Sequence, residues 1–306
     1  MSASRKPIFI AGPTAVGKSE VALLLAELVG GEIISVDSMQ VYRGLDIGTA
    51  KPSPAERARV PHHLIDVVDL TAPFDAAQFA RSAHAAVADI QLRGNVPILC
   101  GGTGLYFRAF LEGLGDAPSA DEALRTELEK LSLEELLREL AERDPVTYKS
   151  IDRQNPRRLV RAVEVIRLTG RPFSEQRADW SEAVVQPPVG RFFALTRSAD
   201  ELRTRIDRRV DAMFERGLVE ETQRLLELGL DRNKTAMQAI GYRQVVEHLH
   251  GERSLEETIA LVKVRTRQFA KRQMTWFRKQ PGMKWVELKA DESAQATAER
   301  LASMAG

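Results

Sequence analysis

The sequence contains little cysteine, almost no net charge and no long apolar segment, and each shortage excludes a class of protein. Its single cysteine, Cys100, cannot form an intrachain disulfide, so a secreted disulfide scaffold is excluded and a reducing cytoplasm is expected. No apolar run approaches the roughly 20 residues that span a membrane, and the N-terminal apolar stretch is too short for a signal peptide. We therefore expect a soluble cytoplasmic protein, with Cys100 buried in a strand.

The balance of charges leaves the partner of the protein open. Lys and Arg total 44 and Asp and Glu total 43, a formal net charge of +1, so any sign of a nucleic-acid partner must be local. Hydrophobic residues make up 43%, which is typical of a folded globular chain. At 306 residues the chain is long enough for a core domain with a second domain or a large insertion.

Short apolar runs alternate with helical patterns in the first third of the chain, which predicts βαβ units and a parallel sheet. We expect strands at 8–11, 33–36, 64–68 and 96–100, and helices at 19–28 and 76–92. From 116 to 186 the pattern is helical only, before further strands at 192–196 and 284–288. The predicted organisation is an α/β core (1–115 and 190–306) with a helical insertion domain (116–189), whose Pro187-Pro188 pair suggests a hinge.

A phosphate-binding motif lies between the first predicted strand and its helix. Residues 12–19 match G-x-x-x-x-G-K-[ST], so the expected core is P-loop NTPase-like, with helices on both faces of the sheet. Its glycines let backbone N–H groups turn toward an anion, and the helix start adds a positive dipole end. Lys18 supplies a cation and Ser19 a hydroxyl ligand for Mg²⁺. The predicted phosphate-binding residues are Gly12, Pro13, Thr14, Ala15, Val16, Gly17, Lys18 and Ser19.

Two further segments follow predicted strands and should open onto the same edge of the sheet. Asp37 comes directly after the second strand, where a carboxylate can act as a general base or simply cap the next turn. Thr103 lies in a Gly-Gly-Thr-Gly turn after the 96–100 strand, which suits either a tight turn or a ligand contact. Asp66 and Asp37 are the candidate acids for helping to hold Mg²⁺.

A basic helix is predicted within the insertion. Asn155 as N-cap and Pro156 at the first position favour a helix start there. Arg157, Arg158 and Arg161 follow, and cations at a helix N-terminus oppose its dipole. An anionic partner would offset that cost, and a solvated charged face is the alternative.

A second basic helix is predicted from Ser254 onward. Seven cations and no acids lie between Lys263 and Lys279, which points to a polyanion in a protein of almost zero net charge. The aromatic residues Phe269, Trp276 and Phe277 are interleaved with these cations, and we expect core packing for them ahead of base stacking.

Seven segments, in this order, resemble the tRNA dimethylallyltransferase family, also called tRNA isopentenyltransferases. They are GPTAVGKS, VDSMQVYRGLDIGTAKP, PHHLID, GGTGLY, NPRRLVRA, AIGYRQ and TRQFAKRQMTWFR, and the match spans nearly the whole chain. The resemblance implies that the phosphate loop holds dimethylallyl diphosphate instead of ATP, with Mg²⁺ as cofactor. It implies transfer of the dimethylallyl group to N6 of the adenosine on the 3′ side of the tRNA anticodon.

The resemblance also implies residue roles. Lys18, Thr14, Ser19 with Mg²⁺, and either Arg205 or Arg209 would stabilise the leaving pyrophosphate, while Asp37 accepts the proton of the amine, with Thr103 beside it. The target adenosine must leave the stack of the anticodon stem-loop. The implied tRNA contacts are Asp37, Ser38, Met39, Gln40, Thr103, Arg125, Arg157, Arg158, Leu159, Val160, Arg161, Gln238, Ala239, Ile240, Gly241, Tyr242, Arg243, Lys271, Arg272, Gln273, Met274, Thr275, Trp276, Phe277 and Arg278.

Two other functions use the same motifs. A small-molecule or nucleoside kinase would also combine a phosphate loop with an acid after the second strand, but would not need the basic helix at 263–279. A nucleic-acid-stimulated NTPase or switch should carry a clear second metal-binding acid. Whatever its function, the protein is expected to be a monomer, since nothing in the sequence indicates an obligate interface.

Overall fold

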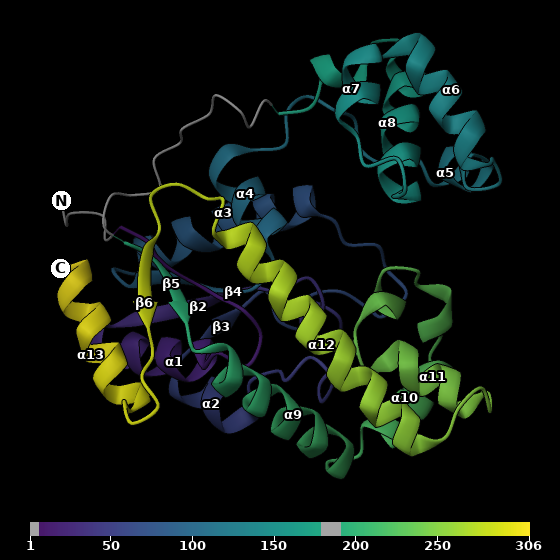
Figure 1. Cartoon of the computed structure of the whole chain (residues 1–306). Helices are drawn as coiled ribbons and strands as arrows, with labels where there is room; N and C mark the ends of the chain where they lie inside the picture. Colours follow the sequence, from purple (N-terminus) through teal and green to yellow (C-terminus); the bar gives the residue numbers. More distant parts are fainter. Residues whose placement is uncertain (1–5, 179–190) are drawn as a thin grey trace. The chain divides into compact units, whose positions relative to one another are not determined.

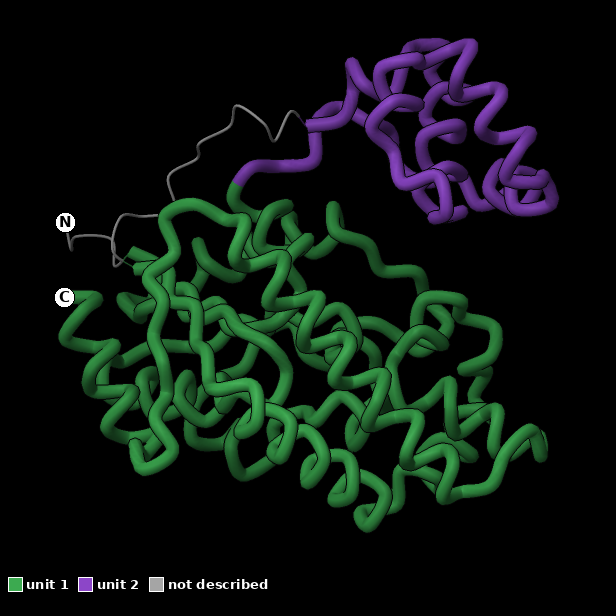
Figure 2. Tube along the Cα trace, viewed as in Figure 1, with its two compact units in different colours: residues 1–111, 185–306 green, residues 112–184 purple. Residues whose placement is uncertain are grey.

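The chain divides into two compact units in a computed structural model that describes residues 6–178 and 191–306. Unit 1 consists of Met1–Leu111 and Val185–Gly306, and unit 2 of Glu112–Val184 (Figure 2). The hinge predicted at Pro187-Pro188 lies outside the described residues.

Unit 1 is built on one six-stranded sheet in which every pair of neighbours is parallel, as predicted (Figure 1). The strand order β3-β2-β4-β1-β5-β6 places β1 in the interior, so the loop after it opens at the middle of the carboxyl edge. The strands are β1 (Ile8–Ala11), β2 (Gly31–Val36), β3 (His62–His63), β4 (Val96–Gly101), β5 (Phe192–Thr196) and β6 (Lys284–Glu287).

The strand predicted at 64–68 is wrong, because β3 ends at His63. Leu64 and Asp66 have φ angles of 60° and 56°, which no strand accommodates. The Asp66 carboxylate accepts a hydrogen bond from Arg57 at 2.8 Å and pairs with Lys51, so ion pairs hold this turn. Asp66 is thereby occupied, and the prediction that it helps to hold a metal ion loses its support.

Helices cover both faces of the sheet, which confirms the predicted layering. Alternate residues of β1 divide between two cores: Ile8 and Ile10 join one, and Phe9 and Ala11 the other. The first core is closed by α1 (Lys18–Val29) and α13 (Ala294–Ala305). The second contains residues of α3 (Ala76–Leu92), α4 (Gly104–Glu112), α10 (Leu218–Glu227), α11 (Tyr242–Leu249) and α12 (Leu255–Phe277).

Ion pairs join α12 to α9 (Ala199–Glu215). Lys263 pairs with Asp211 at 2.6 Å, and Arg267 pairs with Asp207. Two of the seven cations that the sequence places in this helix therefore already have acidic partners. The remaining short helix of unit 1 is α2 (Pro54–Arg59), and a 3₁₀ turn (Ala236–Gln238) precedes α11.

Unit 2 is helical throughout its described part. Its elements are α5 (Glu122–Leu128), α6 (Leu133–Arg143), α7 (Pro145–Ser150), α8 (Pro156–Thr169) and a 3₁₀ turn (Phe173–Glu175). Asn155 caps α8 as predicted, because its side chain accepts the N–H of Arg158 at 3.3 Å. Leu136, Leu140 and Leu159 belong to the separate apolar core of this unit. Nowhere in the described parts of the chain does a helix have the length and apolar character needed to cross a bilayer.

Tyr242 supports a buried polar contact that allows a direct test of unit 1 packing. Its hydroxyl donates to Glu221 at 2.6 Å and accepts the N–H of Gly48 at 3.0 Å. Tyr242→Phe removes both hydrogen bonds and leaves the Gly48 N–H without its acceptor, while Glu221 keeps the N–H of Ile47. We therefore expect the free energy of unfolding to fall by about 1–3 kcal/mol in urea titrations. Tyr106→Phe is the control, because the Tyr106 hydroxyl makes no hydrogen bond within the described chain. Equal losses in the two variants would contradict the role of the Tyr242 hydroxyl.

Candidate active site

Three segments meet at the carboxyl edge of the sheet. The phosphate loop (residues 12–17) follows β1, Asp37 follows β2 and Thr103 lies just beyond β4. The Thr103 hydroxyl oxygen accepts the N–H of Ser38 at 3.2 Å, and the Thr103 N–H donates to Val36 at 3.2 Å. The Asp37 and Thr103 segments are therefore tied to each other as the parallel sheet predicts.

The backbone of the phosphate loop is arranged to receive an anion. Ala15 and Gly17 have φ angles of 63° and 109°, and their N–H groups donate no hydrogen bond within the described chain. Lys18 and Ser19 are the first residues of α1, so their N–H groups have no helical acceptor. Such a run of unpaired donors at a helix N-terminus is a phosphate-binding arrangement.

Lys18 is a desolvated cation beside this loop. Its Nζ donates to the Pro13 carbonyl at 2.7 Å. Burial lowers the pKa of Lys18 to about 8, with Cys100 and Asp37 raising it and Arg209 lowering it by weaker charge interactions. Burial also raises the pKa of Cys100 to about 11, so its thiol is neutral, as expected for a strand residue.

The structure separates the two arginines of α9 between which the sequence leaves a choice. Arg205 donates from Nε to the Ala15 carbonyl at 2.8 Å, and Arg197 donates in the same way to the Val16 carbonyl at 2.9 Å. Burial lowers the pKa of Arg209, and the charge of Asp37 opposes that shift. Arg205 therefore braces the carbonyls of the loop, whereas the charge of Arg209 acts on Asp37 and Lys18.

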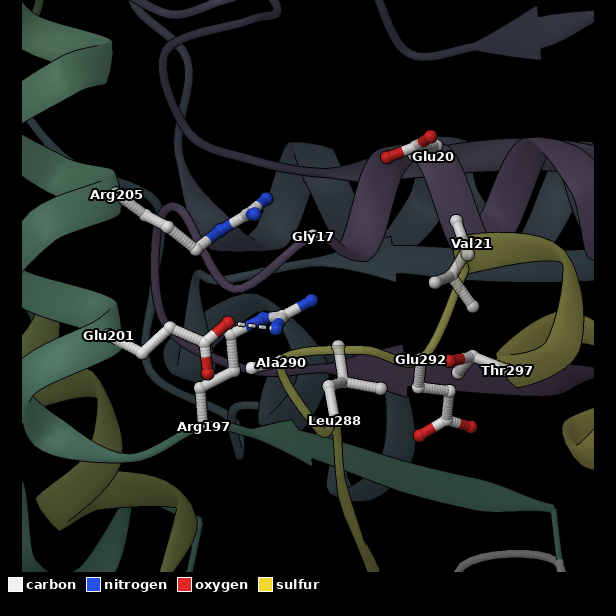
Figure 3. A pocket seen from close by; sticks show the side chains of 11 residues that line it. Gly17, Glu20, Val21, Arg197, Glu201, Arg205, Leu288, Ala290, Glu292 and Thr297 are labelled. Carbon is white, nitrogen blue, oxygen red and sulfur yellow. Dashed lines mark hydrogen bonds and ion pairs between the residues drawn. The ribbon is translucent and has the colours of Figure 1, made fainter.

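A small cavity lies behind the phosphate loop, where Arg197 and Arg205 approach Gly17 (Figure 3). Its volume is about 160 Å³, and Arg197 is ion-paired with Glu201 on its wall. Neither Lys18 nor Asp37 lines it. The cavity therefore lies next to the arginines that hold the loop carbonyls, and not at Lys18 or Asp37. Its lining residues are Gly17, Glu20, Val21, Arg197, Glu201, Arg205, Leu288, Ala290, Glu292, Ala294 and Thr297.

Asp37 caps a turn, and the cap leaves part of its carboxylate open. Oδ1 accepts the N–H groups of Met39 at 2.8 Å and Gln40 at 3.3 Å, while Oδ2 accepts no hydrogen bond within the described residues. The side-chain oxygen of Gln40 accepts a hydrogen bond from the Ser35 hydroxyl at 2.8 Å, which stabilises the turn. The capping and general-base interpretations of Asp37 are therefore compatible.

Several residues for which the resemblance implies tRNA contact have buried side chains. Burial leaves these side chains outside the surface that an RNA could meet in this conformation, and the predicted contacts stay untested. Tyr242 and Phe277 are fully buried in unit 1, and Leu159 is fully buried in unit 2; the others are Val160, Ala239 and Gln273. Gly241 caps α11 with a φ angle of 102°.

Two of the predicted arginines in unit 2 share one buried carboxylate. Glu164 is fully buried and pairs with Arg125 at 2.8 Å and with Arg161 at 2.6 Å. Arg157 and Arg158 are exposed and form no ion pair within the described residues. The predicted arginines of unit 2 therefore fall into two groups. Arg125 and Arg161 are held by Glu164, whereas Arg157 and Arg158 are exposed to solvent.

The second half of α12 presents an open basic surface. Lys271, Arg272 and Lys279 are exposed, and no ion pair within the described residues neutralises them. Together with Gln268, Thr275 and Trp276 they line a groove of about 460 Å³. Phe277 is fully buried and packs edge-on against Trp276, which agrees with the core packing expected for these two residues but not for Phe269, over whose ring Arg272 lies.

Sequence reasoning missed Arg197 altogether and, for Gln273, missed its contact with the phosphate loop. Arg197 directly follows β5, so its place at the end of a predicted strand was a usable signal. Gln273 is buried and accepts the N–H of Thr14 at 2.8 Å, a contact across 259 positions that no local pattern reveals.

The described residues contain no group of three or more His, Cys, Asp or Glu side chains placed to hold a metal ion. Ser19 is exposed at the first turn of α1. This donor set suits Mg²⁺, which typically takes one or two protein ligands and completes its shell with phosphate oxygens and water. His62 and His63 take structural roles, because they bond to Val60 and Glu32 at 2.8 and 2.7 Å.

The lowered pKa of Lys18 predicts a pH-dependent affinity for inorganic pyrophosphate. Lys18 is charged below its pKa of about 8, so affinity should fall as the pH rises through that value, approaching about tenfold per pH unit. Lys18→Arg keeps the positive charge, and its calorimetric titrations should lack this loss. Parallel profiles in the two proteins would show that another group titrates.

The chain matches known proteins over nearly its whole length. The model of the IPP transferase family matches residues 40–280. The tRNA dimethylallyltransferase 1 proteins of Trichlorobacter lovleyi and Citrifermentans bemidjiense are 50% and 49% identical, covering 91% and 92% of this chain and 92% of each relative.

Solved structures agree. The tRNA isopentenylpyrophosphate transferase of Bacillus halodurans has a TM-score of 0.70 at 39% identity, covering 99% of this chain and 97% of its own. A eukaryotic dimethylallyltransferase acting on tRNA has a TM-score of 0.78 at 31% identity, covering 93% of this chain and 74% of its own. By the family match, the sequence identities and the shared structure, this chain belongs to the IPP transferase family.

Proposed function

We propose that this protein is a tRNA dimethylallyltransferase. It transfers the dimethylallyl group of dimethylallyl diphosphate to N6 of the adenosine on the 3′ side of the anticodon, releasing pyrophosphate. The observation that carries the proposal is the open carboxylate of Asp37 beside the cationic phosphate loop, in a chain of the IPP transferase family. The relatives named as tRNA dimethylallyltransferases support the same reaction.

The phosphate loop would stabilise the leaving group. As the bond between the allylic carbon and oxygen breaks, pyrophosphate keeps the electron pair, and the loop N–H groups with Lys18 and Arg209 stabilise that charge. Ser19 would hold Mg²⁺ together with diphosphate oxygens, and the ion would offset further negative charge. Arg205 and Arg197 would act indirectly, because they hydrogen-bond to the Ala15 and Val16 carbonyls and so hold the loop in place.

Asp37 would act on the nucleophile. The lone pair of adenine N6 is delocalised into the ring, so its attack benefits from removal of a proton as the new N–C bond forms. Asp37 Oδ2 is the acceptor, because Oδ1 is engaged by the turn. Thr103, whose oxygen accepts the Ser38 N–H, keeps its own hydroxyl proton for the adenine.

The exposed cations would bind the tRNA. We assign phosphate contacts to Lys271, Arg272 and Arg278 in unit 1 and to Arg157 and Arg158 in unit 2, since all five are exposed. Unit 2 would then serve as the tRNA-binding insertion, acting in the cytoplasm where unmodified tRNA is found.

The decisive experiment incubates the full chain with Mg²⁺, unmodified tRNA and either labelled dimethylallyl diphosphate or labelled ATP. Label should enter tRNA from the prenyl donor alone. ATP turnover without prenyl incorporation would favour a kinase or an NTPase and sink the proposal.

Asp37→Asn tests the general base separately from the turn. The asparagine oxygen can still accept the Met39 N–H, so the fold of the loop should survive while proton acceptance is lost. We expect single-turnover transfer to slow by about 10²–10⁴-fold, with tRNA affinity nearly unchanged. Loss of tRNA binding instead would mean that Asp37 positions the RNA.

The two classes of cation on α12 provide a matched test of the RNA surface. The double variant Lys271→Ala, Arg272→Ala removes two unpaired charges and should reduce the salt dependence of tRNA binding by about 1.5 log units per log unit of salt. Lys263→Met removes a cation that Asp211 already neutralises, so its effect on the slope should be much smaller. Equal slopes in the double variant and wild type would exclude this surface.

A further inference from the structure

Helix α12 touches both loops of the candidate site through one side chain. Gln273 is buried, its Oε1 accepts the Thr14 N–H at 2.8 Å and its Nε2 donates to the Gly102 carbonyl at 3.0 Å. A backbone N–H can only donate and a carbonyl can only accept, so the two partners determine the orientation of the carboxamide. Gln273 therefore bridges the phosphate loop and the glycine-rich turn after β4.

Helix α12 packs unusually closely against the turn after β4. A Cβ atom at Gly102 would lie 2.3 Å from Gln273 Nε2, and one at Gly104 would lie 2.4 Å from the Trp276 ring. Only glycine permits this approach. Because contact is so tight, a displacement of α12 would have to move the Gly102 turn or break the bridge.

The outer side of the same helical turns carries the exposed cations. Lys271, Arg272 and Thr275 face solvent, while Ala270, Gln273 and Phe277 face inward. The surface assigned to tRNA and the contact with the phosphate loop are thus opposite sides of one helix.

We infer that Gln273 is a positioning residue that couples tRNA binding on α12 to diphosphate binding in the phosphate loop. The inference rests on the proposed function. RNA on the outer face holds α12 in place, Gln273 transmits that restraint to Thr14 and Gly102, and the diphosphate meets a loop that is already ordered. Ordering the loop in advance lowers the entropic cost of the second binding step, so tRNA tightens diphosphate binding.

The test measures inorganic pyrophosphate binding with Mg²⁺ by calorimetry, in the presence and absence of saturating unmodified tRNA. In wild type we expect tRNA to tighten pyrophosphate binding by about fivefold or more, the lower end of ordinary coupling between sites. Gln273→Leu keeps the side-chain volume and removes both hydrogen bonds. The ratio of the pyrophosphate affinity with tRNA to that without tRNA should therefore fall to nearly one. If Gln273 had a purely structural role, the variant would lose stability and would bind pyrophosphate more weakly both with and without tRNA. The ratio of these two pyrophosphate affinities would then stay as in wild type.

Two further variants complete the test. Gln280→Leu removes a glutamine whose Nε2 donates to the Trp276 carbonyl and which forms no hydrogen bond with either loop in the described residues. The strengthening of pyrophosphate binding by tRNA should therefore equal that of wild type. Gln273→Glu keeps an acceptor for Thr14 but sets a carboxylate against the Gly102 carbonyl, and its ratio should also fall; this variant decides the matter if Gln273→Leu does not fold.

The outcomes separate the coupling from the proposed function. A wild-type ratio near one, or an undiminished ratio in the Gln273 variants, overturns the coupling even when the protein prenylates tRNA normally. Absence of prenyl incorporation by wild type counts against the proposed function itself.

Discussion

The desolvation of two cations at the carboxyl edge of the sheet is the constraint on which the rest of the site depends. Burial lowers the pKa values of Lys18 and Arg209, which means that their charged forms are held at a cost. Cys100 and Asp37 oppose the shift of Lys18, and Asp37 alone opposes that of Arg209, so one carboxylate interacts with two cations. An anionic ligand would relieve this cost, and a diphosphate with its metal ion supplies such an anion.

The helices that close this edge each make one specific contact with the phosphate loop. Arg205 of α9 holds the Ala15 carbonyl, and Gln273 of α12 holds the Thr14 N–H. Ion pairs between Lys263 and Asp211 join the same two helices to each other. The loop is therefore supported from both helices by side chains, while the N–H groups of Ala15 and Gly17 donate no hydrogen bond within the described residues.

Much of the architecture was predictable because it rests on local patterns. The phosphate motif, the alternation of strands and helices, and the helix starts at Asn155 and Ser254 all depend on neighbouring residues. The prediction of a strand at 64–68 failed because Lys51 and Arg57 hold Asp66 in a turn. The apolar pattern of the sequence does not predict those ion pairs. The burial of several side chains in the implied tRNA segments was equally hidden, since a motif does not say which of its side chains face inward.

The sequence by itself determined the phosphate loop, the placement of Asp37 and Thr103 at one sheet edge, and the family of the chain. These follow from short spacings along the backbone and from the parallel sheet they predict. Only the tertiary structure decided that Arg209 acts on Asp37 while Arg205 braces the loop, and that Gln273 joins two loops. Those assignments depend on which face of a helix meets residues far away in the chain, and that is decided by packing of the whole unit.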